Sequence, residues 1–249
     1  SPAIIAEAFK MVRPHLVVAV PLIIEKIIRK RVFPKIQSNA IKIMLQMPVV
    51  SKKVKERICQ EVYAAFGGEA YEVIVGGAPL NHEIEAFLRD IDFPITTGYG
   101  TTECAPLISY SDYHDFVAGS CGTPVDHMEV KILSNNPRTI AGEIVTRGTN
   151  VMLGYYKNEK ATNKTLDSDG WYHTGDLGTM SADGHIFIRG RSKNMLLGAS
   201  GQNIYPEEIE DKLNSMTMVS ECIVLQRGDH LTALVYPDLD EVKEMGFTD

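Results

Sequence analysis

Cysteine is scarce in this sequence, and its few copies follow no pattern. The chain of 249 residues contains Cys59, Cys104, Cys121 and Cys222. No two of them form a CxxC pair, and no histidine stands at zinc-finger spacing from them. The spacing therefore suggests neither a disulfide framework nor a zinc knuckle, and it favours a reducing compartment, the cytoplasm.

Long apolar runs and a surplus of basic residues are also absent. No stretch reaches the roughly 20 apolar residues of a membrane-spanning helix, and the opening SPAIIAEAFK lacks the basic start and long apolar middle of a signal peptide. The net charge of -7 at pH 7 excludes a general basic surface for nucleic acid. We therefore expect no membrane-spanning segment and no nucleic-acid partner.

The composition that is present is typical of a folded globular protein. Hydrophobic residues make up 44% and charged residues 23% of a chain that is long enough for one large domain or two unequal ones. The sequence opens at Ser1 rather than at a methionine, in a stretch that is typical of the middle of a domain. We therefore expect a piece of a larger protein.

The first part of the chain alternates short buried strands with amphipathic helices, which predicts an α/β fold. Residues 14–21 are a valine-rich run between two prolines, as in a strand buried on both faces, and residues 52–66 repeat apolar side chains at helical spacing. Residues 22–31 predict a helix with a basic end. Its basic face fits either a solvated surface or a peripheral contact with anionic lipid at the inner face of a membrane.

A βαβ unit follows and is the most informative segment of the chain. Residues 71–75 and 94–97 predict two strands, with Asn81 as the cap of the helix between them. Such strands are parallel with a right-handed crossover, so the turns that follow them leave the same edge of the sheet and line one crevice. One turn contains Gly76, Gly77, Ala78 and Pro79, and the other contains Gly98, Tyr99, Gly100, Thr101, Thr102 and Glu103.

The side chains of the second turn suit a magnesium nucleotide. Tyr99 can stack on a purine, and the hydroxyls of Thr101 and Thr102 can donate to a phosphate. Glu103 can offer a hard oxygen ligand to Mg²⁺, and the glycines let the backbone approach a ligand closely. Taken alone, the same residues also fit an ordinary turn between a strand and a loop.

From about residue 117 onwards, short strands and tight turns predict an antiparallel sheet or a small barrel. Residues 169–177 are too rich in glycine and polar side chains for a core, and Trp171 within them is expected to pack rather than to bind. Asp176, which we expect at the edge of a strand, can accept hydrogen bonds from both hydroxyls of a ribose.

A polar stretch at residues 190–193 separates this region from a new α+β pattern. We expect residues 1–189 to be the C-terminal part of a large domain, with an α/β layer at 1–115 and an antiparallel, barrel-like subdomain at 116–189. Residues 190–193 are expected to be a hinge, and residues 194–249 the front part of a small, mobile domain. In that part we expect a hairpin over 194–205 and a helix that opens at Pro206.

Five segments of the chain carry a family resemblance. They are GGAPL at 76–80, GYGTTE at 98–103, GYYKNEKAT at 154–162, DGWYHTGDLG at 169–178 and IRGRSKNMLLGASGQNIYPEEIE at 188–210. Their order and wording resemble the AMP-forming adenylating superfamily of acyl-CoA synthetases, luciferases and peptide-synthetase adenylation domains. The last two, together with VPLIIEKI at 20–27, look most like bacterial long-chain fatty acid CoA ligases.

The resemblance implies a role for each matching residue. Tyr99 would pack on adenine, Thr102 would hold the α-phosphate, and Glu103 would bind Mg²⁺. Asp176 would hold the ribose hydroxyls beside Arg191. The other implied positions are Lys193 as the hinge residue, Gly76, Gly77, Ala78 and Pro79 beside adenine and acyl chain, and Ser200 and Gly201 near the arm of CoA.

The resemblance also implies the reaction, in which ATP activates a fatty acid as an acyl-adenylate that CoA then converts to a thioester. The family's phosphate loop is missing, and Lys243 does not match the lysine that the family uses for adenylation, so this chain by itself is expected to be inactive. Two alternatives stay open: an adenylation domain that loads an amino or aryl acid onto a carrier protein, and a nucleotide-binding module without catalysis.

Overall fold

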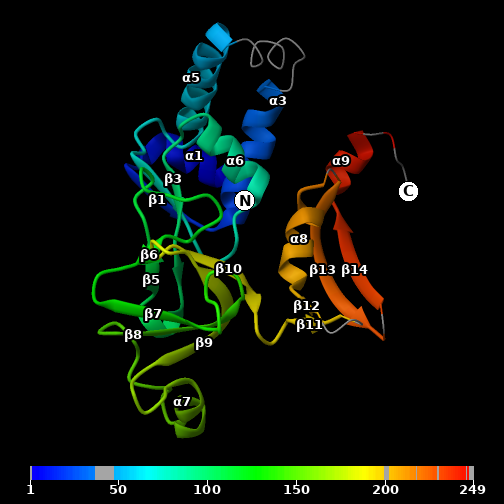
Figure 1. The fold of residues 1–249 in the computed structure, drawn as a ribbon. Helices are drawn as coiled ribbons and strands as arrows, with labels where there is room; N and C mark the ends of the chain where they lie inside the picture. The colour runs from blue at the N-terminus through cyan, green and yellow to red at the C-terminus, as the bar shows by residue number, and fades with distance from the viewer. Residues whose placement is uncertain are drawn as a thin grey trace. The chain divides into compact units, whose positions relative to one another are not determined.

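The computed structural model describes residues 2–36, 48–198, 202–216, 218–228, 230–244 and 246. The chain forms two compact units, the first from Ser1–Thr102 with Pro106–Val125 and the second from Glu103–Ala105 with Asp126–Asp249. Figure 1 labels the helices and strands of the chain. Residues 103–105 therefore belong to the second unit, although the residues directly before and after them belong to the first. Residues 190–193 lie inside the second unit.

The first unit is built on a parallel sheet. Its strands are β1 (Leu16–Ala19), β2 (Glu72–Val75) and β3 (Ile95–Thr97), in the order β1-β2-β3. All neighbours are parallel, and Val75 at the end of β2 is paired with Thr97 at the end of β3. The predicted parallel unit is therefore confirmed, and the carboxyl ends of these strands meet at one edge.

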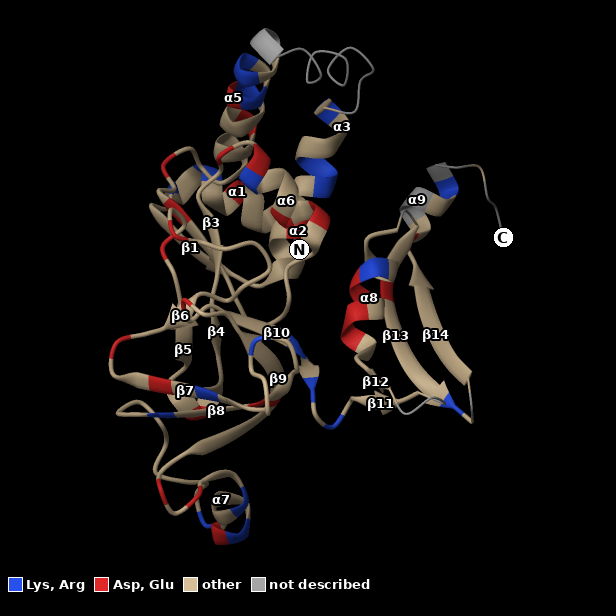
Figure 2. Ribbon diagram, in the orientation of Figure 1, with Lys and Arg blue, Asp and Glu red and all other residues tan. Residues whose placement is uncertain are grey.

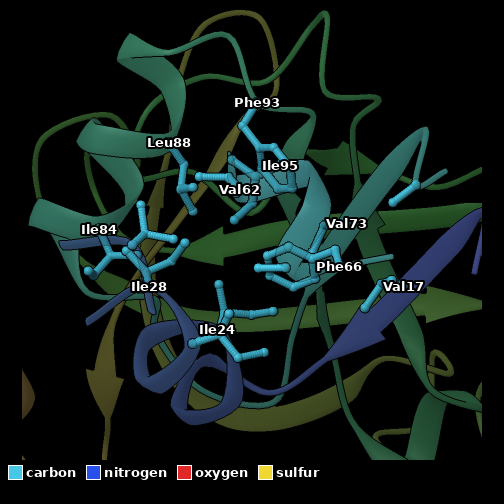
Figure 3. Packing of buried hydrophobic residues seen from close by; sticks show 14 of the residues in the cluster. Val17, Ile24, Ile28, Val62, Phe66, Val73, Ile84, Leu88, Phe93 and Ile95 are labelled. Carbon is cyan, nitrogen blue, oxygen red and sulfur yellow. The ribbon is translucent and has the colours of Figure 1, made fainter. Parts of the chain in front are cut away.

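Helices pack on this sheet around one hydrophobic core. The predicted helix over 22–31 begins one residue early, because Pro21 suits a first helical position, and it continues as the π-helical segment η1. Phe66 is fully buried and packs in the core with Phe93 (Figure 3). Its ring lies 5.6 Å from that of Phe9 and 5.5 Å from that of Phe93. The elements are α1 (Pro2–Val12), α2 (Pro21–Ile27), η1 (Ile28–Val32), α3 (Phe33–Ile36), α5 (Pro48–Ala65) and α6 (His82–Asp90).

Lys and Arg residues, blue in Figure 2, concentrate on two helical segments of this unit. Residues 21–36 and 48–65 together contain nine Lys or Arg and three Glu, a net charge of 9 − 3 = +6, so the rest of the chain carries −7 − 6 = −13. Lys35 on α3 and Glu61 on α5 form an ion pair at 2.5 Å. The basic surface predicted for one helix therefore extends to a second. In the described part of the chain, no helix is long and apolar enough to cross a membrane.

The first unit also contains a small three-stranded sheet, and the second unit a larger antiparallel one. The small sheet consists of β4 (Tyr99–Gly100), β5 (Leu107–Tyr110) and β6 (Thr123–Pro124). The larger sheet has the order β10-β9-β8-β7 and is open, not a closed barrel. Its strands are β7 (Met128–Leu133), β8 (Gly142–Gly148), β9 (Tyr172–Met180) and β10 (Ile186–Arg191), with the short helix α7 (Glu159–Thr165) before β9.

The segment that looked too polar for a core is a central strand. The expectation for residues 169–177 was wrong, because the polar groups of β9 find partners inside the sheet. The Thr174 hydroxyl donates to the Ile144 carbonyl at 2.8 Å, and the Gly175 amide donates to the Glu143 carboxylate at 3.1 Å. Trp171 packs as expected, 8% exposed.

The end of the second unit has the predicted α+β pattern. The hairpin expected over 194–205 is present as β11 paired with β12, and Pro206 opens α8 as predicted. The Glu210 carboxylate on α8 accepts the Val224 amide of β13 at 2.7 Å, which ties the helix to the last hairpin. The elements are β11 (Leu196–Leu197), β12 (Asn203–Ile204), α8 (Pro206–Asn214), β13 (Val219–Arg227), β14 (His230–Pro237) and α9 (Leu239–Glu244).

The cap of α6 gives a stability prediction. The Asn81 carboxamide oxygen accepts the amides of Glu83 at 3.1 Å and Ile84 at 3.3 Å, as the sequence predicted. Asn81→Ala should lower the free energy of unfolding by about 1 kcal/mol in urea denaturation, because two amides of the first turn lose their acceptor. Asn81→Ser, which keeps an acceptor, should lower it by less. Equal urea midpoints for all three proteins would contradict the capping role.

Candidate functional site

Two glycine turns lie side by side at the carboxyl edge of the parallel sheet. The Gly76 amide donates to the Ala19 carbonyl at 3.1 Å, and the Gly98 amide donates to the Val75 carbonyl at 2.9 Å. A Cβ atom on Gly76 would lie 3.6 Å from the Gly98 carbonyl oxygen, so the two backbones are neighbours. The predicted adjacency of these turns is confirmed. Gly77, Ala78 and Pro79, the other residues of the first turn, are exposed.

The second turn folds back as the β4–β5 hairpin. Tyr99 is paired with Ser109, and a Cβ atom on Gly100 would overlap the carbonyl oxygen of Pro106, so only glycine fits there. The Thr101 amide donates to that same carbonyl at 2.8 Å. The hairpin thus fixes the backbone of the loop between Tyr99 and Thr101, while the Tyr99 ring stays half-buried.

A buried hydroxyl in this loop lacks a partner. Thr101 Oγ1 is buried and has no hydrogen-bond partner among the residues that the structure describes. Leaving such a group unsatisfied costs about 1–3 kcal/mol, so a ligand oxygen at this position would be stabilised. Thr102, the next residue, is exposed and begins the 3₁₀ segment η2 (Thr102–Cys104). The loop therefore offers hydroxyls where a phosphate is expected.

Glu103 follows directly in the chain and packs in the second unit. One carboxylate oxygen accepts the Tyr155 hydroxyl at 2.7 Å, and the Glu103 carbonyl accepts the Met152 amide at 2.7 Å. Burial would raise the pKa of the Glu103 carboxyl, but the hydrogen bonds from Tyr155 and Tyr172 lower it. The charge of Arg191 lowers it further, and the pKa of Glu103 ends below its ordinary value. At neutral pH the group is a carboxylate.

Tyr155 and Tyr172 are residues of this site to which the sequence analysis gave no role. The pKa of Tyr155 is raised, mainly because its hydroxyl donates to Glu103 and further because it is partly buried. Both tyrosines stand in recognised motifs, GYYKNEKAT and DGWYHTGDLG. The motifs were therefore a signal, but only the fold shows which carboxylate their side chains contact.

Asp176 and Arg191 form a second polar cluster in the same unit. They are paired across β9 and β10, and Arg191 Nε lies 3.0 Å from Asp176 Oδ1. The Asp176 side chain is 7% exposed and that of Arg191 65%, so the guanidinium covers a buried carboxylate. The expectation that Asp176 stands at a strand edge was wrong, because β9 continues through it to Met180.

The expected hinge, residues 190–193, overlaps this pair, because its first two residues, Gly190 and Arg191, are the end of β10. Lys193 is exposed, and the Ser192 amide before it donates to the Gly175 carbonyl at 2.9 Å. Glu207 at the start of α8 accepts the Asn194 side-chain amide at 2.8 Å. Ser200 and Gly201, the residues implied for CoA, lie outside the described residues.

The donor set fits Mg²⁺ when it is bound together with phosphate. In the ranges that the structure describes, no group of three His, Cys, Asp or Glu side chains could hold a metal by itself. Mg²⁺ is usually bound by one or two carboxylates and the phosphates of a substrate, keeping several waters. The ionised Glu103 can supply such a carboxylate.

Two hollows lie on the first unit. One of about 570 Å³ is apolar and reaches Gly76; it is lined by Phe9, Leu16, Val17, Val18, Val20 and Ile23, among others. The other, of about 620 Å³, lies along α6 beside His82, Glu85 and Gly119. There the Glu85 carboxylate already accepts the Gly119 amide at 2.9 Å. Only the apolar hollow reaches a predicted site residue.

Known proteins resemble this chain in sequence and in fold. The family described as AMP-binding enzyme matches residues 1–156. The long-chain-fatty-acid–CoA ligase FadD15 of Mycobacterium bovis is 34% identical over 168 residues, 68% of this chain and 27% of that protein. The 4-coumarate–CoA ligase 1 of Glycine max is 37% identical over 187 residues, 70% of this chain and 63% of that one.

The likeness in fold extends over nearly the whole chain. O-Succinylbenzoate coenzyme A synthetase (MenE) from Bacillus subtilis, solved in complex with ATP and a magnesium ion, aligns with a TM-score of 0.71 at 23% identity. The alignment covers 98% of this chain and 48% of that one. This chain spans about a quarter of the length of the FadD15 ligase.

The contact between Tyr155 and Glu103 predicts a change in acidity. Tyr155→Phe should raise the pKa of the Glu103 carboxyl, because a donor to the charged form is lost while burial remains. A ¹³C NMR titration of the labelled glutamate carboxyl would measure the shift. Tyr156→Phe is the matched control, since Tyr156 is 87% exposed, and it should leave the pKa of Glu103 in place. Equal titration curves for both variants would contradict the contact.

Proposed function

The chain belongs to the family of AMP-binding enzymes, and from this we propose that it is part of an ATP-dependent, AMP-forming acid–thiol ligase. In the proposed reaction a carboxylate attacks the α-phosphate of MgATP and gives an acyl-adenylate and pyrophosphate. A thiol then attacks the acyl carbon and displaces AMP, which gives the thioester. The family match, over residues 1–156, includes both glycine turns and Glu103.

The observation that carries the proposal is the buried Thr101 hydroxyl without a protein partner among the described residues. It stands in a loop whose backbone is fixed by the β4–β5 hairpin and where Gly100 excludes a side chain. A phosphate oxygen is an acceptor of the kind that this hydroxyl lacks. We therefore infer that this loop binds a phosphate through the Thr101 hydroxyl.

The site residues would have separate roles in the reaction. Adenine would lie beside the Tyr99 ring, close to the turns at Gly76 and Gly98. Glu103 would hold Mg²⁺, which neutralises charge on the phosphates as it develops. Asp176 would accept hydrogen bonds from the ribose hydroxyls.

We propose a long-chain fatty acid as the substrate and CoA as the acceptor. The apolar hollow of about 570 Å³ beside Gly76 offers the kind of surface that an acyl chain buries well. A relative 34% identical to this chain has the name of a long-chain-fatty-acid–CoA ligase. The aryl-acid name of the 37% identical relative makes an aromatic acid the main competitor.

Thioester formation by the complete protein tests this proposal. The protein should be assayed with ATP and Mg²⁺ across fatty acids of increasing chain length, aromatic acids and amino acids, with CoA or a carrier protein as the acceptor. The expected result is AMP release that depends on a long-chain acid and on CoA. A preference for aromatic acids would overturn the substrate, and no acid-dependent AMP release would overturn the ligase.

The role of Glu103 gives a kinetic prediction. In the complete protein, Glu103→Gln should reduce ATP–pyrophosphate exchange by roughly 100-fold or more while ATP affinity changes little, because a metal ligand acts mainly on charge that develops in the transition state. Exchange kinetics together with nucleotide titration would measure both. Unchanged exchange would remove the metal role of Glu103.

We also propose that residues 190–193 form a hinge between residues 1–189 and the small domain that begins at residue 194, and that this hinge turns between the two half-reactions. Residues 191–194 are all exposed and begin at Arg191, the last residue of β10. Glu207 accepts hydrogen bonds from the Arg191 amide at 3.4 Å and from the Asn194 side-chain amide at 2.8 Å. Gly190 has a φ of +154°, and a Cβ atom there would lie 2.6 Å from Glu207 Oε2. Rotation here would present another face of the small domain to the same acyl-adenylate.

The hinge predicts a split between the two half-reactions. Lys193→Pro in the complete protein should leave one half-reaction near normal and reduce the other by about 10-fold or more, because proline restricts φ to about −65° and locks one state. Pyrophosphate exchange and single-turnover thioester formation from acyl-adenylate would report the two steps. Lys193→Ala keeps the backbone free and should preserve both; parallel losses in the proline variant would rule out the hinge.

A further inference from the structure

The motif at residues 154–162, GYYKNEKAT, has no role in the proposed reaction, yet its first residues lie along Glu103. The Tyr155 hydroxyl donates to Glu103 Oε1 at 2.7 Å, and the Met152 amide donates to the Glu103 carbonyl at 2.7 Å. Residues 152–155, at the start of this motif and just before it, therefore contact both the side chain and the main chain of this one residue.

The position of Tyr155 is set by contacts with α7. Its amide donates to Thr162 Oγ1 at 2.9 Å. Gly154, with a φ of +149°, brings the backbone so close that a Cβ atom there would lie 2.8 Å from Thr162 Cγ2. A side chain at position 154 would push the segment away from the helix, so this position requires glycine.

The first turn of α7, which leads to Thr162, is itself held by hydrogen bonds to Asn158. Asn158 caps α7, its side-chain oxygen accepting the Ala161 amide at 3.1 Å. The Thr162 hydroxyl donates to the Asn158 carbonyl at 3.0 Å while it accepts from Tyr155. Hydrogen bonds thus hold the Tyr155 backbone on the first turn of α7, and the Tyr155 side chain reaches from there to the Glu103 carboxylate.

We propose that this segment is a brace for the metal ligand, with Tyr155 as a positioning residue that orients the Glu103 carboxylate toward Mg²⁺. The inference rests on the proposed function, because it takes Glu103 as the magnesium ligand. A glutamate side chain has three rotatable bonds, and a fixed donor such as Tyr155 restricts the direction in which the carboxylate points. Outer partners of this kind change metal affinity by about 10- to 100-fold when they are removed.

The test measures Mn²⁺ binding rather than turnover. Electron paramagnetic resonance would give the affinity of Mn²⁺ for the complete protein saturated with α,β-methylene-ATP, which cannot release AMP. Tyr155→Phe and Thr162→Val are expected to weaken Mn²⁺ binding by about 10-fold, because the first removes the donor and the second releases the backbone that carries it. Thr162→Ser keeps the hydroxyl and should restore the affinity.

Controls separate the failure of this inference from the failure of the proposed function. Tyr156→Phe, at an 87% exposed position next in the chain, should bind Mn²⁺ as the unaltered protein does. If Glu103→Gln weakens Mn²⁺ binding and Tyr155→Phe does not, the brace is overturned and the metal site stands. If Glu103→Gln binds Mn²⁺ normally, the proposed metal site itself is overturned. Thermal unfolding of each variant would confirm that it is folded.

Discussion

Parallel pairing of β2 and β3 is the constraint on which the rest of this structure depends. Because their ends are in register at Val75 and Thr97, the turns that follow leave the sheet at one edge. The core beneath, where α2, α5 and α6 bury their apolar faces on the sheet, keeps that edge rigid (Figure 3). Loops on a rigid edge can approach a ligand with the precision that phosphate chemistry requires.

The first unit buries apolar side chains on its sheet, whereas the second unit also buries polar groups within a sheet. Its central strand β9 contains Thr174, Gly175 and Asp176, and the first two find partners on β8. Asp176 is covered by the guanidinium of Arg191 across the ladder. A buried carboxylate with a charged partner is costly to hold and is therefore typical of a functional position.

The chain passes from the first unit to the second between Thr102 and Glu103, two residues of the proposed site. Thr102 ends a loop of the first unit, and Glu103 packs in the second. A hydroxyl expected to contact phosphate and a carboxylate expected to hold its metal are thus consecutive residues. Such an arrangement makes the orientation of Glu103 depend on groups of the second unit, Tyr155 above all. Charge is also distributed unevenly along the chain, since the helical segments at residues 21–36 and 48–65 together carry a net charge of +6 while the whole chain carries −7.

Local sequence determined the elements and much of the proposed site. Apolar periodicity, Asn81 as a cap and the glycine turns depend on neighbouring residues, so they could be read without the fold. Only the tertiary structure decided what distant residues do to one another. The ion pair that covers the buried Asp176 joins it to Arg191, 15 positions later in the sequence, through the pairing of β9 with β10. The hydrogen bond between Tyr155 and Glu103 joins residues 52 positions apart. No local sequence pattern encodes either contact.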